Sequence, residues 1–147
     1  MSHEVTVEDV AARTTAVIAA ATTWQEFPTL WMELLGEVWA CLREGGVHRG
    51  CPNIMLYRDD LPHVEVGVEL TQPCPLTGRV VASTLPAGRV AMTVHRGSYD
   101  GLRSAHQAVL DWCGAHGRRL AGPRWEIYGP HRDAPAELWT KVYYLLS

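Results

Sequence analysis

The sequence predicts an α+β domain in which two main helices cover a largely antiparallel sheet. Strand-like segments are joined by short turns, which favours antiparallel pairing. Only two segments have the apolar spacing of a helix, and both halves of the 147-residue chain show the same order of elements. The halves also share a weak internal sequence similarity. Residues 52–57 align with residues 123–128, so that Met55 matches Glu126, 71 positions later. We therefore expect one domain over residues 1–147, built from a duplicated module.

The first module is expected at about residues 5–70. Small and β-branched side chains suit a pleated surface and predict strands at the start of the chain. A helix follows, because apolar residues recur at three- and four-residue steps; Pro28 suits its first turn. In the last strand, valines alternate with Glu65 and Glu69, so we expect one buried face and one solvent-facing face. The expected strands are 5–10, 13–23, 54–57 and 63–70, and the expected helix is 24–44.

The second module is expected at about residues 79–147, after a linker at 71–78 that contains two prolines and a glycine. It repeats the order of the first module. Ser98 is the expected N-cap of its helix, and Gly114 and Gly117 mark the end of that helix. A turn-rich loop is expected at 129–136. The expected strands are 80–85, 89–95, 124–128 and 139–146, and the expected helix runs from 99 to about 116.

Composition excludes several classes of function. A net charge of -3 and the absence of a basic run argue against direct nucleic-acid binding. The apolar segments are too short to span a membrane, and the first residues lack a signal-peptide pattern, so we expect a cytoplasmic protein. None of the four cysteines has the spacing of a metal ligand set, and we expect them to be reduced. We expect no metal and no cofactor.

Four short blocks resemble a known family. Residues 85–91, 95–102 and 125–128, together with Gly67-Val68-Glu69, are similar to the signature blocks of GyrI-like proteins, also called AraC-type effector-binding or gyrase-inhibitor-like domains. The resemblance covers nearly the whole chain. It implies two β-α-β-β modules of the SHS2 type, related by a pseudo-twofold axis.

The resemblance also implies a function. Family members bind bulky, often aromatic and cationic, small molecules in a cleft between the modules. In transcription regulators the domain follows a DNA-binding helix-turn-helix, whereas here the domain uses the whole chain, so we expect a stand-alone member. Some stand-alone members resemble drug-sequestering proteins, which implies multidrug binding and drug resistance. One branch hydrolyses cyclopropane rings of DNA-alkylating natural products.

Glu126 is the principal candidate site residue, because the resemblance implies that the carboxylate of its Glu-x-Tyr block faces the ligand cavity. A carboxylate in a partly desolvated aromatic pocket attracts an organic cation more strongly than one in water. If burial raises its pKa, the same carboxylate can serve as a general base, and it is the expected catalytic residue if the protein is an enzyme. The alternative is a glutamate on a solvated strand face.

Seven further residues are candidate ligand-binding residues. Tyr128 shares a strand face with Glu126, and Tyr57 and Met55 take the equivalent places in the first module. The resemblance also suggests pocket aromatics at the positions of Trp139 and His95. A hydrogen-bonded surface position is the alternative for His95. Packing in the core, or at its rim, is the alternative for Tyr128, Tyr57 and Met55. Packing in the core is also the alternative for Trp31 and Trp39, which lie on one face of the first helix.

Three functions remain open from the sequence. The first is non-catalytic binding of a flat, hydrophobic, cationic compound, with Glu126 as its counter-charge. The second is hydrolysis of a strained ring by water, with Glu126 positioning or deprotonating that water. The third is a protein-partner role, such as gyrase inhibition or co-regulation. Gly97 and Tyr99 are interpreted as structural residues at the start of the second helix.

Overall fold

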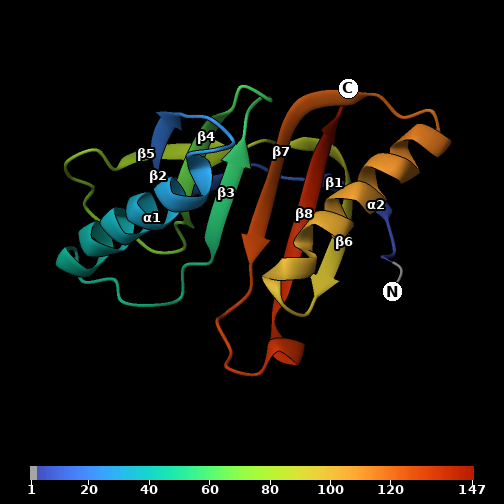
Figure 1. The fold of residues 1–147 in the computed structure, drawn as a ribbon. Coiled ribbons are helices and arrows are strands. Elements are labelled where there is room, and N and C mark those ends of the chain that lie inside the picture. Colours follow the sequence, from blue (N-terminus) through green and yellow to red (C-terminus); the bar gives the residue numbers. More distant parts are fainter. Residues whose placement is uncertain (1–2) are drawn as a thin grey trace.

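The structure, a computed structural model, describes residues 3–147 and contains an eight-stranded sheet with two helices on one face (Figure 1). All neighbouring strands are antiparallel. The predicted α+β class is therefore confirmed. The strands are β1 (Thr6–Val10), β2 (Arg13–Ala21), β3 (Asn53–Tyr57), β4 (His63–Glu69), β5 (Val81–Leu85), β6 (Gly88–Arg96), β7 (Leu120–Tyr128) and β8 (Trp139–Leu146). The helices are α1 (Phe27–Glu44) and α2 (Leu102–Ala115), with single 3-10 turns at η1 (Tyr99–Gly101) and η2 (Pro135–Glu137).

The strand order shows how the two halves are combined. The order β1-β6-β8-β7-β3-β4-β2-β5 is symmetric about the central pair of β3 and β7. In that pair Met55 lies opposite Glu126, the same residue with which it aligns in the internal sequence similarity. The pseudo-twofold axis therefore passes between these two residues. The first strand of each half pairs with a strand of the other half: β1 pairs with β6, and β5 pairs with β2.

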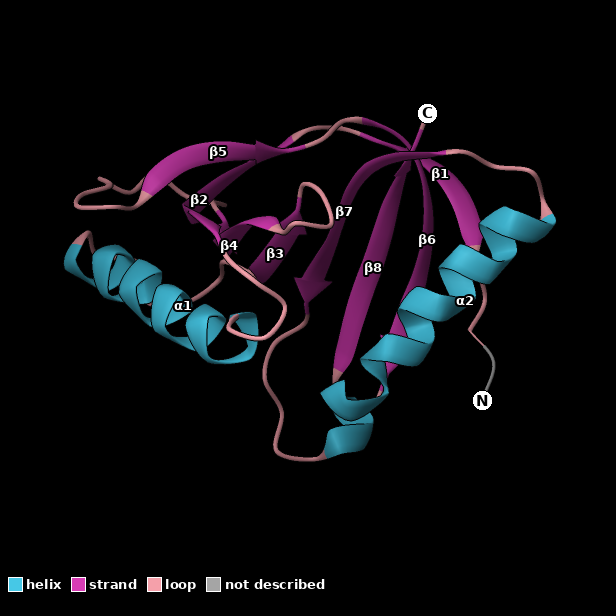
Figure 2. Ribbon diagram, turned by 45° about the horizontal axis from the view of Figure 1, so that its top comes forward, coloured by secondary structure: helices cyan, strands magenta, loops and turns pink. Residues whose placement is uncertain are grey.

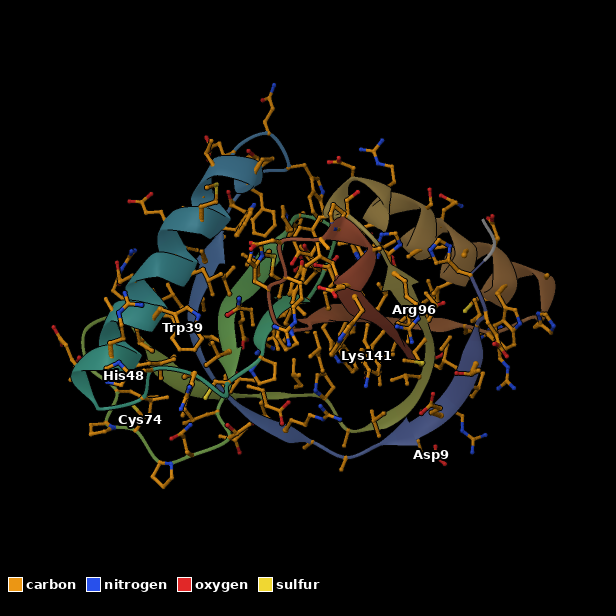
Figure 3. The ribbon with its side chains drawn as sticks, turned by 90° about the horizontal axis from the view of Figure 1, so that it is seen from below. Asp9, Trp39, His48, Cys74, Arg96 and Lys141 are labelled. Carbon is orange, nitrogen blue, oxygen red and sulfur yellow. The ribbon has the colours of Figure 1, made fainter. Side chains whose placement is uncertain are left out.

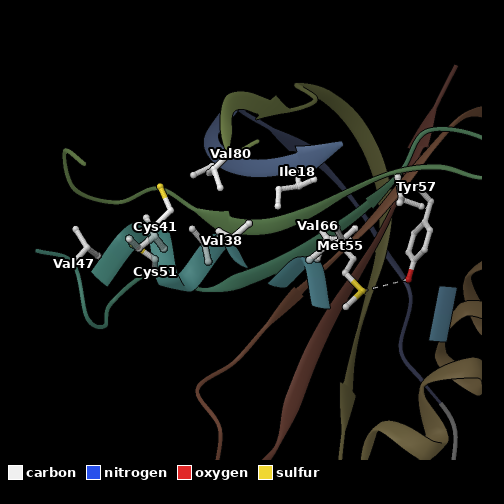
Figure 4. Close-up of a cluster of buried hydrophobic side chains, with 14 of the residues drawn as sticks. Ile18, Val38, Cys41, Val47, Cys51, Met55, Tyr57, Val66 and Val80 are labelled. Atoms are coloured by element: carbon white, nitrogen blue, oxygen red, sulfur yellow. Dashed lines mark hydrogen bonds between the residues drawn. The ribbon is translucent and has the colours of Figure 1, made fainter. Parts of the chain in front are cut away.

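Three apolar clusters hold the sheet and helices together. Under α1, Val38 packs with Val66 and Met55 in the largest cluster (Figure 4). Under α2, a smaller cluster contains Val109 and Val142. A third cluster lies on the face of the sheet opposite the helices, where burial of apolar surface again stabilises the fold. Its centre is a pair of stacked rings, Trp125 and Tyr143, with centroids 5.5 Å apart. Figure 2 shows the outer strands β1 and β5 arching around this side.

The third cluster explains one wrong prediction. Glu65 was expected on a solvent-facing strand face, but it is buried, with 3% of its surface exposed. The face of β4 that carries it belongs to the buried side of the sheet, and the glutamate is paired with Arg58. Glu69, at the end of the same strand, is more exposed and binds Arg13 at 3.1 Å. A buried charge needs such a partner, because isolated burial is costly.

Element boundaries differ from prediction by three residues or more at the starts of α1, α2 and β7. Helix α1 begins at Phe27, three residues later than expected, and β7 begins at Leu120, four residues earlier. A register shift between Leu120 and Arg124 allows that strand to continue around the sheet. Ser98 makes no side-chain capping bond, because the turn η1 precedes α2. Within residues 3–147, neither helix is long and apolar enough to cross a membrane.

Candidate functional site

A cavity of about 380 Å³ lies on the helix-bearing face, above the central pair of strands. Its floor comes from β3 and β7, and its walls come from the first turns of α1 and from the beginning of α2. Most of the lining is aromatic or aliphatic, which is usual for a small-molecule site. The lining residues are Phe27, Pro28, Trp31, Leu35, Asn53, Met55, Tyr57, Tyr99, Leu102, Glu126, Tyr128, Gly129 and His131. We call this space the central cavity.

Strand alternation explains the composition of the floor. Met55 and Glu126 lie opposite each other, and side chains two residues along each strand point to the same face. Tyr57 and Tyr128 therefore flank the Met55–Glu126 pair on the side of the helices. In Figure 4, the hydroxyl group of Tyr57 reaches the sulfur of Met55, at 3.7 Å. The twofold relation of the strands thus gives a nearly symmetric floor with one charge.

The carboxylate of Glu126 is buried and accepts three hydrogen bonds. Its Oε1 lies 3.2 Å from the hydroxyl of Tyr57 and also accepts the hydroxyl of Tyr128. Its Oε2 lies 2.6 Å from Nε2 of His106. Only 3% of the residue is exposed. A carboxylate has about four acceptor positions, so three donors occupy most of them and compensate for the lost hydration.

The tyrosines around Glu126 remain hydrogen-bond donors over a wide pH range. Burial, reinforced by the negative charge of Glu126, raises the pKa of Tyr57 and of Tyr128 above the usual tyrosine value. Burial also raises the pKa of Tyr144 to about 12. Loss of these protons would place further negative charge beside a buried carboxylate, which is unfavourable.

Arg124 carries the other charge near the floor, but its side chain is engaged outside the central cavity. Its guanidinium carbon lies 5.4 Å from the ring centre of Tyr57 and 5.6 Å from that of Trp24. Its Nη1 also donates to Asp60 at 2.8 Å. These contacts fix the cation behind the ring of Tyr57, so Glu126 is the charged group on the cavity floor.

Five of the eight candidate residues line the central cavity: Glu126, Tyr128, Tyr57, Met55 and Trp31. Trp39 lies outside it, farther along α1 (Figure 3). Its indole N–H donates to Oδ1 of Asn53 at 2.8 Å, so it supports a lining residue from behind.

Trp139 and His95 also lie outside the central cavity. Trp139 begins β8 on the face that carries Lys141, whose ammonium lies 5.5 Å from the ring centre. Strand alternation directs that face away from the helices. His95 faces α2 but lies beneath η1, where its Nε2 is 2.7 Å from the carbonyl oxygen of Ser98. Its ring fills the space below Gly101.

Two residues that lie behind and beside Glu126 were not predicted as site residues. Tyr99 was interpreted as structural, yet its ring lines the cavity and meets Tyr128 edge to face, with centroids 5.8 Å apart. His106 was not considered at all. Its position between Leu102 and Val109 on the apolar stripe of α2 was the available signal, because such a position usually carries an apolar residue.

The donor set offers no evident metal site. Within residues 3–147, no three side chains of histidine, cysteine, aspartate or glutamate are grouped so as to hold a metal ion. The four cysteines are free thiols. The central cavity is lined by the carboxylate of Glu126, the imidazole of His131, three tyrosine hydroxyls and the apolar walls. The imidazole of His106 lies behind the floor, against Glu126.

Solved structures share this fold. The C-terminal domain of EcmrR is 16% identical, with a TM-score of 0.77 over 100% of this chain and 99% of that one. SAV2435 bound to tetraphenylphosphonium is 13% identical, with a TM-score of 0.69 over 98% of this chain and 94% of that one. A hydrolase from Listeria innocua is 12% identical, with a TM-score of 0.57 over 99% of this chain and 93% of that one. At these identities the likeness concerns the fold alone.

Comparison at the level of sequence identifies the family. No curated protein matches the chain. The family model of the GyrI-like small molecule binding domain matches residues 3–146, which is nearly the whole length. The chain belongs to the GyrI-like small molecule binding domain family.

Proposed function

We propose that the protein binds bulky aromatic compounds with a permanent positive charge in its central cavity. The observation that carries the proposal is the buried carboxylate of Glu126 on the floor of an aromatic cavity. A negative charge in a partly desolvated site acts over a longer range than the same charge in water. The ligand itself supplies the missing counter-charge.

The hydrogen bonds of Glu126 indicate which kind of cation fits. Tyr57, Tyr128 and His106 already occupy most of its acceptor positions. A ligand with many N–H donors would have to compete with these groups. A lipophilic cation whose charge is shielded or delocalised needs only the electric field of the carboxylate, and its rings can stack on Trp31 and Tyr99.

Two further findings support the proposal. The cavity volume of about 380 Å³ falls in the range typical of small-molecule sites. The chain also belongs to a family of small-molecule-binding domains, and SAV2435, which shares its fold, is bound to tetraphenylphosphonium. We extend this chemistry to the present protein as capture or sensing of multidrug-type ligands, with an adaptable wall at Met55.

A pair of ions with matched shapes tests the proposal. Tetraphenylphosphonium and tetraphenylborate have nearly the same size, but opposite charge. We expect the phosphonium to quench tryptophan fluorescence with saturable binding, and the borate to bind at least about 30-fold more weakly, since it faces the field of Glu126 with the wrong sign. Equal affinity would show that charge does not select the ligand. Absence of binding by both ions would contradict the cavity as a binding site.

Ring-opening hydrolysis is a second candidate function, and one observation favours it. Oε2 of Glu126 accepts a single hydrogen bond, from His106, whose other ring nitrogen lies 2.8 Å from Tyr144. A water molecule at the free position of Oε2 could add its hydroxyl to one carbon of a cyclopropane, while its proton passes through Glu126 to the released carbon. Turnover separates the two functions: a water adduct in excess of enzyme supports hydrolysis, and stoichiometric retention of unchanged compound supports binding.

A further inference from the structure

His106 is a titratable side chain held directly behind the floor of the central cavity. It lies on the buried side of α2, one helical turn from Leu102. Both ring nitrogens are engaged: Nε2 is 2.6 Å from Oε2 of Glu126, and Nδ1 is 2.8 Å from the hydroxyl of Tyr144. These two contacts fix the imidazole relative to the carboxylate. Any change in its charge therefore acts on the cavity at a constant distance.

We propose that His106 sets the net charge of the central cavity, and thereby makes capture of a lipophilic cation depend on pH. The inference rests on the proposed function, because it concerns the same cavity and the same carboxylate. With His106 neutral, Glu126 presents one uncompensated negative charge to a ligand. With His106 protonated, the Glu126–His106 pair is neutral, and a cationic ligand loses its counter-charge.

The hydrogen-bond geometry accommodates both states of His106. An ionised carboxylate only accepts hydrogen bonds, so Nε2 of His106 carries a hydrogen in either state. The atom that gains or loses the proton is then Nδ1. Without a proton, Nδ1 accepts the hydroxyl hydrogen of Tyr144; with a proton, it donates to the same oxygen. Rotation of one hydroxyl hydrogen is sufficient, and no heavy atom needs to move.

Among residues 3–147, strands β3, β7 and β8 on the sheet side of His106 provide no histidine and no carboxylate besides Glu126. From β7, Arg124 is paired with Asp60, so their charges offset each other. From β3 and β8, Tyr57 and Tyr144 have a raised pKa and stay neutral, as does Tyr128 from β7.

Further titratable or charged groups lie on the helix side and at the cavity rim, among them Tyr99 of η1. Asp100 and Arg103, at the start of α2, are exposed to solvent. His95 of β6 is bound beneath η1 to the carbonyl oxygen of Ser98. His131 lines the rim of the cavity, on the loop after β7. His48, exposed on the loop after α1 and outside the cavity lining, supplies a matched control for His106.

Titration with tetraphenylphosphonium between about pH 5.5 and about pH 8.5 tests the inference, because this cation has no ionisable group and histidine changes charge in that range. In His106→Gln, the side-chain amide can still donate to Glu126 but cannot titrate. We expect wild-type affinity to fall by about 10- to 100-fold toward the acid end of the range, since one unit of counter-charge is lost. His106→Gln should bind tightly at every pH, and His48→Gln should follow the wild type.

Each outcome separates the inference from the function on which it rests. Failure to bind the phosphonium at any pH overturns both. If the wild-type protein binds the phosphonium with equal affinity at both ends of the pH range, the proposed function stands and the role of His106 is overturned. A His106→Gln variant that keeps the wild-type pH dependence has the same consequence. If the His106→Gln variant does not fold, NMR titration of the His106 ring in the wild-type protein tests the inference instead. Saturating phosphonium should shift the midpoint to lower pH by linkage, and an unshifted midpoint contradicts the inference.

Discussion

Replacing Glu126 by glutamine removes the charge of the cavity floor while preserving its size and most of its hydrogen bonds. The amide oxygen can accept the hydroxyls of Tyr57 and Tyr128 as the carboxylate does. The amide nitrogen can donate to Nε2 of His106, provided that this ring moves its hydrogen to Nδ1 and donates to Tyr144. Glu126→Gln thus isolates the contribution of charge.

The cavity dimensions give the expected magnitude. A sphere of about 380 Å³ has a radius of about 4.5 Å, so a central cation lies on the order of 5–6 Å from the floor carboxylate. At an effective dielectric constant of about 20, the attraction at that distance is about 3 kcal/mol, and solvent at the open side reduces it. We therefore expect Glu126→Gln to weaken binding of tetraphenylphosphonium by about 1–3 kcal/mol, or roughly 5- to 150-fold in Kd.

Fluorescence titration and calorimetry at neutral pH measure this difference. Thermal unfolding provides the control, because a variant with preserved hydrogen bonds should melt within a few degrees of the wild type. The affinity for a neutral aromatic compound of similar size should change little. An unchanged Kd for the phosphonium in a folded Glu126→Gln protein would refute the electrostatic reasoning.

Three further predictions follow from the walls, the sheet and the tyrosines. Trp31→Ala should raise the Kd for tetraphenylphosphonium by about 5- to 30-fold, because it removes a stacking ring. Trp39→Phe, which lies outside the cavity, should change this Kd by no more than about twofold. Parallel titrations of the two variants measure both effects. Gly67→Ala should destabilise the fold by about 1–3 kcal/mol, because the new Cβ would lie 1.9 Å from the carbonyl oxygen of Ala16. Gly36→Ala, in open space on α1, should stabilise the fold by roughly 0.5–1 kcal/mol. Denaturant unfolding measures both changes, and equal effects would contradict the packing argument. Stability should be retained up to about pH 10 and then fall with rising pH, because the unfolded tyrosines ionise near that value. The folded Tyr57, Tyr128, Tyr143 and Tyr144 have a raised pKa and hold their protons. Phenolate absorbance should therefore rise together with unfolding, and full ionisation of all five tyrosines before unfolding would count against these assignments.

The fold was predictable because its signals are local. Alternating valines in β4 and the apolar stripe of α1 identify their elements without any knowledge of the tertiary structure. The exchange of β1 and β5 between the halves was not predictable, since strand pairing is a long-range property. The burial of Glu65 was missed for the same reason: periodicity shows that a strand has two faces, but not that both are covered.

The candidate site was predicted best where strand alternation could be combined with the family resemblance. Glu126, Tyr128, Tyr57 and Met55 lie on two paired strands, and their common face follows from their spacing. Trp139 lies outside the central cavity, because the face that a strand's first residue occupies depends on how the strand pairs with its neighbours. His106 comes from a helix, far from the Glu-x-Tyr block in sequence, and only the folded chain brings its ring to Glu126.

The position of a bound cation tests the central claim most directly. Tetraphenylarsonium is the arsenic analogue of the phosphonium, and the anomalous scattering of arsenic locates its charged atom in a crystal. We expect the arsenic above the Met55–Glu126 pair, on the order of 5–7 Å from the carboxylate, with phenyl rings against Trp31 and Tyr99. Arsenic at another place, such as the hollow beside Arg96 and Lys141 on the opposite face of the sheet (Figure 3), would contradict the account.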